Sequence, residues 1–69
     1  LVISDHRMPY VTGVALLQAV RATTATPFIL ITADRSVERE ALAAGVTELL
    51  TKPISIAALR AAVARHLPA

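Results

Sequence analysis

Three short apolar runs alternate along the chain with three stretches of helical periodicity. The runs are Leu1–Ser4, Phe28–Ile31 and Val46–Thr51. They are continuous rather than alternating, which is typical of strands covered on both faces, as in a parallel sheet. A helix that connects two parallel strands forms a right-handed crossover. The order therefore predicts an α/β fold with a three-stranded parallel β-sheet and alternating helices.

The helical stretches carry recognisable start and stop signals. Residues Gly13–Thr23 are predicted to form the first helix because their apolar side chains recur on one face. We expect Ser36 to cap the second helix, Gly45 to end it, and Ser55 to cap the third. The apolar face of the third helix is expected to consist of Ile56, Leu59, Val63 and Leu67.

Length and composition exclude several classes of protein. The 69 residues make one domain at most, and 55% hydrophobic against 17% charged residues argue against disorder. The sequence contains no cysteine, which fits a reducing compartment, and we expect a cytoplasmic location. We expect no membrane segment, because the longest apolar run is too short to span a bilayer. Direct nucleic-acid binding is not expected either, because no basic stripe is interleaved with aromatic residues.

Asp5, Thr32 and Lys52 stand where the three predicted strands end. In a parallel sheet these ends meet at one edge, where open α/β sheets bind ligands. A phosphoryl group on Asp5 would add negative charge and acceptor oxygens. Lys52 would pair with one oxygen, and the Thr32 hydroxyl and Ala33 amide would donate to another. Together the residues indicate phosphoryl transfer to a carboxylate, whereas singly each is also typical of a turn, a strand end or a solvated surface.

The segments LVISDHRMPYVTG, ILITA and LLTKP together resemble the receiver domain of two-component response regulators. The resemblance runs from Leu1 to Leu67 and implies a flavodoxin-like fold. It implies that Asp5 is the phospho-acceptor, that Thr32 is the switch hydroxyl residue and that Lys52 pairs with the phosphate. Ala33 resembles the small residue after the switch position, whose backbone amide binds the phosphoryl group.

Further positions of the same family pattern are present. Met8, Pro9 and Gly13 match the loop that follows the acceptor, and Pro53 matches a proline usually preceded by a cis bond. The resemblance implies a signal receiver rather than an enzyme, with a histidine kinase or phosphotransfer protein as its partner. A nucleotide-binding enzyme is disfavoured because no glycine-rich phosphate loop follows any predicted strand.

The chain also departs from the family pattern. The family begins with an additional strand, helix, strand and helix, so residues 1–69 are expected to form a partial, truncated receiver domain. The first of those strands ends in the acidic pair that holds Mg²⁺. The ligands implied here are the Asp5 carboxylate and the Arg7 backbone carbonyl, an incomplete set for an ion that prefers octahedral oxygen coordination. We therefore expect weak or absent Mg²⁺ binding and poor phosphorylation of this chain.

Two functional hypotheses remain open. One is a receiver that accepts phosphate from a histidine kinase, and the other is a receiver-derived structural or dimerisation module without phosphoryl chemistry. An acidic pair encoded upstream of Leu1 in the parent gene would favour the first. Leu49 stands where the family usually has Tyr or Phe, so the usual aromatic readout of the switch is not expected.

Self-association is a further expectation. In the family's sheet order the strand Leu1–Ser4 would lie beside the first strand, so here its outer edge would be unpaired and would recruit another strand. Part of the apolar face of the last helix would also be exposed. We therefore expect a homodimer, formed through Leu1–Ser4 or through the last helices.

The histidines and aromatic residues are expected to have ordinary structural roles. His6 is expected to be a solvated loop residue, and His66 is expected to interact with the carbonyls at the end of the last helix. Phe28 is expected in the core, and Tyr10 is expected to cover the loop after Asp5.

Overall fold

The computed structural model describes residues 1–67, and residues 68–69 of the predicted domain lie outside the described part. Strands and helices alternate along the chain as the apolar runs predicted. The elements are β1 (Val2–Asp5), α1 (Gly13–Arg21), β2 (Phe28–Thr32), the 3-10 turn η1 (Arg35–Val37), α2 (Glu38–Ala44), β3 (Glu48–Thr51) and α3 (Ile56–His66).

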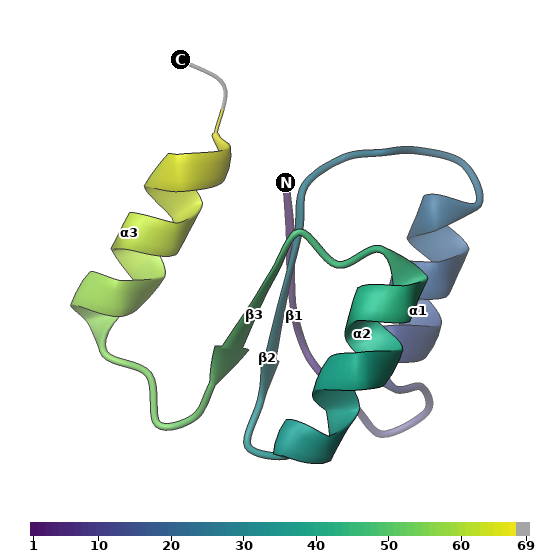
Figure 1. The fold of residues 1–69 in the computed structure, drawn as a ribbon, viewed down its shortest axis with the longest axis horizontal. Coiled ribbons are helices and arrows are strands. Elements are labelled where there is room, and N and C mark those ends of the chain that lie inside the picture. Colours follow the sequence, from purple (N-terminus) through teal and green to yellow (C-terminus); the bar gives the residue numbers. More distant parts are fainter. Residues whose placement is uncertain (68–69) are drawn as a thin grey trace.

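The three strands form one parallel sheet in the order β1-β2-β3. Ile3 of β1 is in register with Ile29 of β2, which is in register with Glu48 of β3. Helices α1 and α2 cover one face of the sheet, and α3 stands on the other (Figure 1). The predicted α/β class with a three-stranded parallel sheet is confirmed.

The hydrophobic core lies between the sheet and the two helices α1 and α2. Leu17 of α1, Phe28 and Leu30 of β2, and Ala41 of α2 are fully buried there. Side chains alternate across a strand, so Ile29 points to the opposite face, where it is also fully buried. Burial of each large side chain contributes about 1.5–3 kcal/mol, and the predicted core position of Phe28 is confirmed.

Cap chemistry sets two helix ends as predicted. The Ser55 hydroxyl accepts a hydrogen bond from the Ala58 N–H at 3.0 Å and begins α3. Gly45 ends α2 with φ of 91°, a left-handed conformation that favours glycine. The first helix also has a capping hydroxyl, since Thr12 accepts from the Ala15 N–H at 3.1 Å.

The predicted cap at Ser36 is wrong. Asp34 caps the preceding turn η1 instead, and its Oδ1 accepts hydrogen bonds from the Ser36 N–H at 2.9 Å and the Ser36 hydroxyl at 2.6 Å. The turn begins two residues earlier than predicted, at Asp34, because this carboxylate accepts from the backbone amide two residues ahead. Ser36 therefore lies inside η1, and α2 begins directly after η1.

One predicted apolar contact is wrong. Tyr10 does not cover the loop, since it is 99% exposed. An antiparallel bridge between Arg7 and Thr12 closes this loop, and Tyr10 lies near its tip. Part of the apolar face of the last helix is exposed, as expected: Ile56 at the start of α3 and Leu67 at its C-cap are both exposed, whereas Ala62 is buried.

The last residue of the first helix and the first residue of the third strand each differ by two positions from the prediction. The helix ends at Arg21 rather than Thr23, and β3 begins at Glu48 rather than Val46.

None of the helices within residues 1–67 is both long enough and apolar enough to cross a membrane.

Candidate functional site

The carboxyl ends of the three strands bring the predicted site residues to one edge of the sheet. Asp5 is the last residue of β1 and Thr32 is the last residue of β2, while Lys52 directly follows β3. The Lys52 ammonium forms an ion pair with Asp5 Oδ2. The structure therefore joins two of the predicted site residues directly, across the end of the central strand.

Asp5 is held as an accessible carboxylate. Its Oδ1 accepts a hydrogen bond from the Arg7 N–H at 3.2 Å, and its side chain is 41% exposed. The hydrogen bond from Lys52, followed by that from the Arg7 backbone, lowers the pKa of Asp5 below its ordinary value. The group is therefore ionised at neutral pH and reachable from solvent, as a carboxylate nucleophile must be.

A polar cleft of about 400 Å³ opens beside this carboxylate. Its walls come from the loop after β1, the end of β2 and the residue after β3. The lining residues are Asp5, Arg7, Thr32, Ala33, Asp34 and Lys52. The cleft thus contains every residue that was predicted to accept, bind or pair with the phosphoryl group or to hold the metal, together with Asp34.

Thr32 lines the cleft, but its hydroxyl is engaged elsewhere. The side chain is 3% exposed. The hydroxyl accepts a hydrogen bond from the Asp34 N–H at 3.0 Å and lies 3.5 Å from the Asp34 carbonyl oxygen. To donate to a group on Asp5, the hydroxyl would have to give up its contact with the Asp34 carbonyl oxygen.

Gly13 brings the start of α1 against the backbone of the acceptor loop. Its N–H donates to the His6 carbonyl at 2.7 Å. A Cβ at this position would lie 2.8 Å from the His6 Cα, closer than real Cβ atoms approach, and 3.0 Å from the Asp5 carbonyl oxygen, which is an unusually tight contact. Glycine is therefore required here for the close approach rather than for a left-handed backbone.

His6 is not the solvated residue that was expected. It is half-buried, and its Nδ1 is buried without a hydrogen-bond partner among the described residues. The close approach of Gly13 to the backbone of His6 leaves little room around this part of the loop.

The family resemblance implies a Mg²⁺ ion beside Asp5, held by the Asp5 carboxylate and the Arg7 carbonyl. Here one Asp5 oxygen accepts from the Arg7 N–H and the other is paired with Lys52. No group of three or more potential metal-binding side chains occurs within residues 1–67. The implied pair, the Asp5 carboxylate and the Arg7 carbonyl, falls short of octahedral oxygen coordination.

The prediction for His66 is wrong. Its Nε2 lies 2.7 Å from Oε1 of Glu48 on β3, whereas contact with the carbonyls at the end of its own helix was expected. The carboxylate offers a charged acceptor that the helix end does not. Glu48 was not singled out from the sequence, since its partners come from a helix that follows it in the chain.

A second groove opens on the α3 side of the same edge, with a volume of about 650 Å³. Apart from Asp5, Lys52 and Ser55 its lining is apolar. The apolar lining residues are Ile31, Ala33, Pro53, Ile54, Ile56 and Leu59. The peptide bond before Pro53 is cis, as the resemblance implied.

Comparisons with known proteins agree on one family. The family model described as the response regulator receiver domain matches residues 1–64. A probable chemotaxis protein CheY from Rhizobium etli is 41% identical, over 91% of this chain and 53% of that protein. The chain therefore spans about half the length of this curated relative.

Solved structures also resemble this chain. The chemotaxis protein CheY4 of Vibrio cholerae superposes with a TM-score of 0.82 at 33% identity, covering 94% of this chain and 58% of that chain. Full-length ShkA, solved in complex with AMPPNP, matches with a TM-score of 0.74 at 45% identity. That match covers 93% of this chain and 13% of ShkA.

Proposed function

The chain belongs to the family of response regulator receiver domains of two-component signalling, and we propose that Asp5 is the residue that accepts its phosphoryl group. The observation that carries this proposal is the ion pair between Lys52 and an accessible Asp5 carboxylate at the sheet edge. Receiver domains interact with histidine kinases or phosphotransfer proteins, so the proposed donor is a phosphohistidine.

The proposed step is a single phosphoryl transfer. One Asp5 oxygen attacks the phosphorus atom, an O–P bond forms and the N–P bond of the phosphohistidine breaks. The electron pair of the broken bond stays on the imidazole nitrogen, which takes up a proton from solvent. Asp5 becomes an acyl phosphate, and the protein acts as a signal receiver rather than as an enzyme that releases a product.

The neighbours of Asp5 are proposed to stabilise the added charge. Lys52 already contacts Asp5 and would pair with a phosphoryl oxygen as a positive point charge. The Thr32 hydroxyl would leave the Asp34 backbone and donate to a second oxygen, and the backbone amide of Ala33, a residue of the same cleft, would donate as well. Leu49 is partly buried against the core, so this rearrangement would not be reported by an aromatic side chain.

We further propose that these 69 residues alone bind Mg²⁺ weakly and are phosphorylated slowly. The reason is the donor set described above, one carboxylate and one backbone carbonyl. Residues 1–69 are proposed to act as part of a receiver domain in the cytoplasm. The chain contains no cysteine, so reducing conditions there would break no disulfide bond.

Chemical trapping tests the assignment of the acceptor. A phosphorylated histidine donor would be mixed with the chain, and the product reduced with borohydride, which converts an aspartyl phosphate to homoserine. We expect homoserine at position 5. Asp34 is the other carboxylate of the cleft. Homoserine at position 34, with Asp5 unmodified, would contradict the proposal.

A second candidate function is a receiver-derived dimerisation module. The observation in its favour is that β1 lies at the edge of the sheet, where Ile3 is 44% exposed. An unpaired edge beside an exposed apolar side chain recruits another strand. Two copies would pair their β1 edges around a two-fold axis, and this function would need no phosphoryl chemistry.

A further inference from the structure

We propose that Met8 is an oxidation site that controls the loop between β1 and α1. A peroxide converts its thioether to the sulfoxide, and the sulfoxide loosens the attachment of the loop to the sheet. This loop, residues 6–12, is called the acceptor loop below. The oxidation site does not depend on phosphorylation of Asp5, whereas its effect on phosphorylation rests on the function proposed above.

Met8 is the residue that anchors the acceptor loop. Of residues 7–12, five are exposed and Met8 alone is half-buried. The Ser4 hydroxyl lies 3.8 Å from the Met8 sulfur, and Ser4 is a buried residue of β1, 6% exposed. A thioether is a flexible apolar group and a weak acceptor. It therefore packs against the strand while the rest of the loop faces solvent at the end of β1 (Figure 1).

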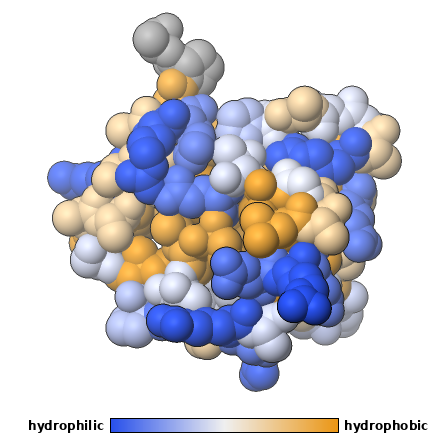
Figure 2. All heavy atoms as spheres, in the orientation of Figure 1, coloured by the Kyte–Doolittle hydropathy of each residue, from blue (hydrophilic) through white to orange (hydrophobic). Residues whose placement is uncertain are grey.

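The sulfur of Met8 is the one sulfur atom in the sequence, which contains one methionine and no cysteine. Peroxides oxidise thiols and thioethers. Figure 2 shows apolar surface between α2 and α3, and the groove beside α3 is lined by aliphatic side chains such as Ile31, Ile54 and Leu59, which contain no sulfur. Met8 is only half-buried, so a molecule as small as hydrogen peroxide reaches it.

The proposed modification is a two-electron oxidation of the thioether. A sulfur lone pair attacks one oxygen of the peroxide, an S–O bond forms and the O–O bond breaks. The other oxygen takes up the proton of the transferred oxygen and leaves as water. Sulfur is oxidised and the peroxide is reduced. Methionine sulfoxide reductases reverse this product, so the modification can act as a switch.

The sulfoxide changes the contact beneath the acceptor loop. The single proton of the Ser4 hydroxyl has two acceptors in reach, the Asp5 carbonyl oxygen at 3.0 Å and the Met8 sulfur at 3.8 Å. A sulfoxide oxygen is a polar acceptor and adds an atom beside a buried residue. The Met8 side chain then turns out to solvent or draws the Ser4 proton away from the Asp5 carbonyl. Each of these changes removes part of the anchor.

This loosening reaches the Asp5 carboxylate through the residue before Met8. The Arg7 N–H donates to Asp5 Oδ1 at 3.2 Å, and the Gly13 N–H donates to the His6 carbonyl at 2.7 Å. Both contacts depend on the position of the loop backbone. Displacement of Met8 therefore removes a donor that orients Asp5, and phosphoryl transfer to Asp5 becomes slower.

Amide hydrogen exchange of the full chain tests the effect on the loop. The chain would be treated with hydrogen peroxide until its intact mass shows one added oxygen atom. We expect the Arg7 and Gly13 amides to exchange roughly three- to tenfold faster after oxidation, as for the loss of one hydrogen bond. The amides of α3, on the other face of the sheet, should not change. Methionine sulfoxide reductase should restore the original rates.

Acetyl phosphate labelling separates this inference from the proposed function. The oxidised chain should be labelled more slowly than the reduced chain, and equal rates would overturn the link from Met8 to Asp5. If neither form is labelled while exchange of the loop amides still accelerates on oxidation, the result supports the Met8 site and counts against Asp5 as the phospho-acceptor.

Two variants assign the effect to the sulfur atom. Met8→Leu keeps an apolar side chain that cannot be oxidised, so peroxide should leave its exchange rates unchanged. Met8→Gln places a polar side chain at the anchor and should show fast exchange at Arg7 and Gly13 without peroxide. Unchanged exchange at these amides in the fully oxidised parent, or the same acceleration by peroxide in Met8→Leu, would overturn the proposal.

Discussion

Asp5 and Lys52 lie 47 positions apart in the chain and form an ion pair at the edge of the sheet. Their strands are not neighbours, because β2 lies between β1 and β3. The two side chains meet across the end of β2, so the parallel sheet itself creates the pair. This relationship is the basis of the first prediction.

Removal of Lys52 should raise the pKa of Asp5. The hydrogen bond from Lys52 is the main cause of the lowered value, so Lys52→Ala should move the pKa up towards the ordinary value of 3.8. A carboxyl carbon NMR titration would measure it. Arg60→Ala, at an exposed cation of α3, is the matched control and should leave the Asp5 titration unchanged; an equal change in both variants would refute the pairing.

Gly13→Ala should destabilise the chain by about 1–3 kcal/mol, the range for overpacking. The added Cβ would lie 2.8 Å from the His6 Cα, which is backbone and has little freedom to move. Urea denaturation measures the loss. Gln18→Ala, at an exposed position of the same helix, should stay within about 0.5 kcal/mol of the parent. A Gly13→Ala variant as stable as the parent would show that the helix start is not tightly placed.

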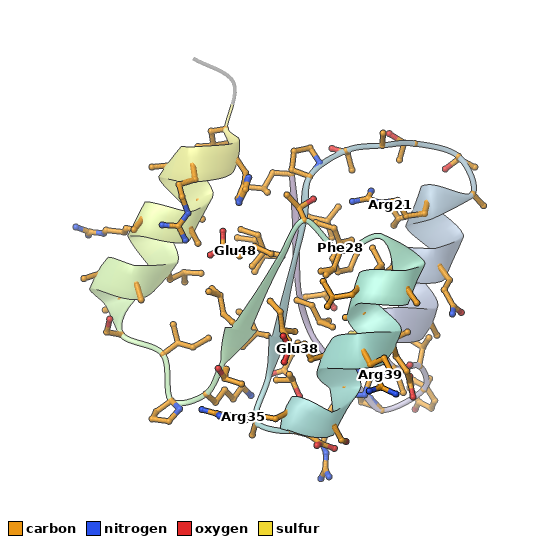
Figure 3. The ribbon with its side chains drawn as sticks, viewed as in Figure 1. Arg21, Phe28, Arg35, Glu38, Arg39 and Glu48 are labelled. Carbon is orange, nitrogen blue, oxygen red and sulfur yellow. The ribbon has the colours of Figure 1, made fainter. Side chains whose placement is uncertain are left out.

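Arg21→Ala should cost about 1–3 kcal/mol, since three acceptors lose a charged donor, one of them in a partly buried contact. Arg21 donates to the Gly45 carbonyl at 2.9 Å, the Thr26 carbonyl at 2.6 Å and the Thr47 hydroxyl at 3.3 Å. Figure 3 shows this side chain beside the end of α1. Denaturant titration provides the measurement.

Two further variants identify the cause of that loss. Arg21→Lys should recover only part of the stability, because a lysine cannot reproduce the planar fork of donors. Arg39→Ala, at an exposed arginine of α2, should be nearly neutral. If Arg21→Lys were fully as stable as the parent, the three hydrogen bonds of Arg21 would contribute nothing beyond the positive charge of this side chain.

The chain of 69 residues should form a homodimer through β1 at micromolar concentration, as sedimentation equilibrium would measure. Ile3→Lys places a charge on the exposed edge and should give a monomer. Leu42→Lys, at a 62% exposed position on α2, should remain dimeric. A parent chain that sediments as a single monomeric species would rule out this association.

The sequence was sufficient for features fixed by local chemistry. The apolar runs predicted three parallel strands correctly, although only β2 is largely buried, and the cap residues Gly45 and Ser55 predicted two helix ends correctly. The edge position of Asp5, Thr32 and Lys52 also followed, because parallel strands end at the same side. Each of these inferences needs only neighbouring residues or the order of elements.

Features that depend on distant partners could not be predicted. His66 contacts Glu48 from 18 positions away, and Arg21 reaches the Gly45 carbonyl from 24 positions away. No periodicity in the sequence links such residues. In the site, the position of Thr32 was predictable, but the present engagement of its hydroxyl by the Asp34 backbone was not, because it depends on the turn after β2.

The identity of the acceptor is tested most directly by the intact mass of the chain after treatment with acetyl phosphate and Mg²⁺. We predict slow, incomplete addition of one phosphoryl group to the parent chain and to Asp34→Asn, and no addition to Asp5→Asn. Addition to Asp5→Asn at the rate of the parent would contradict the assignment of Asp5 as the phospho-acceptor.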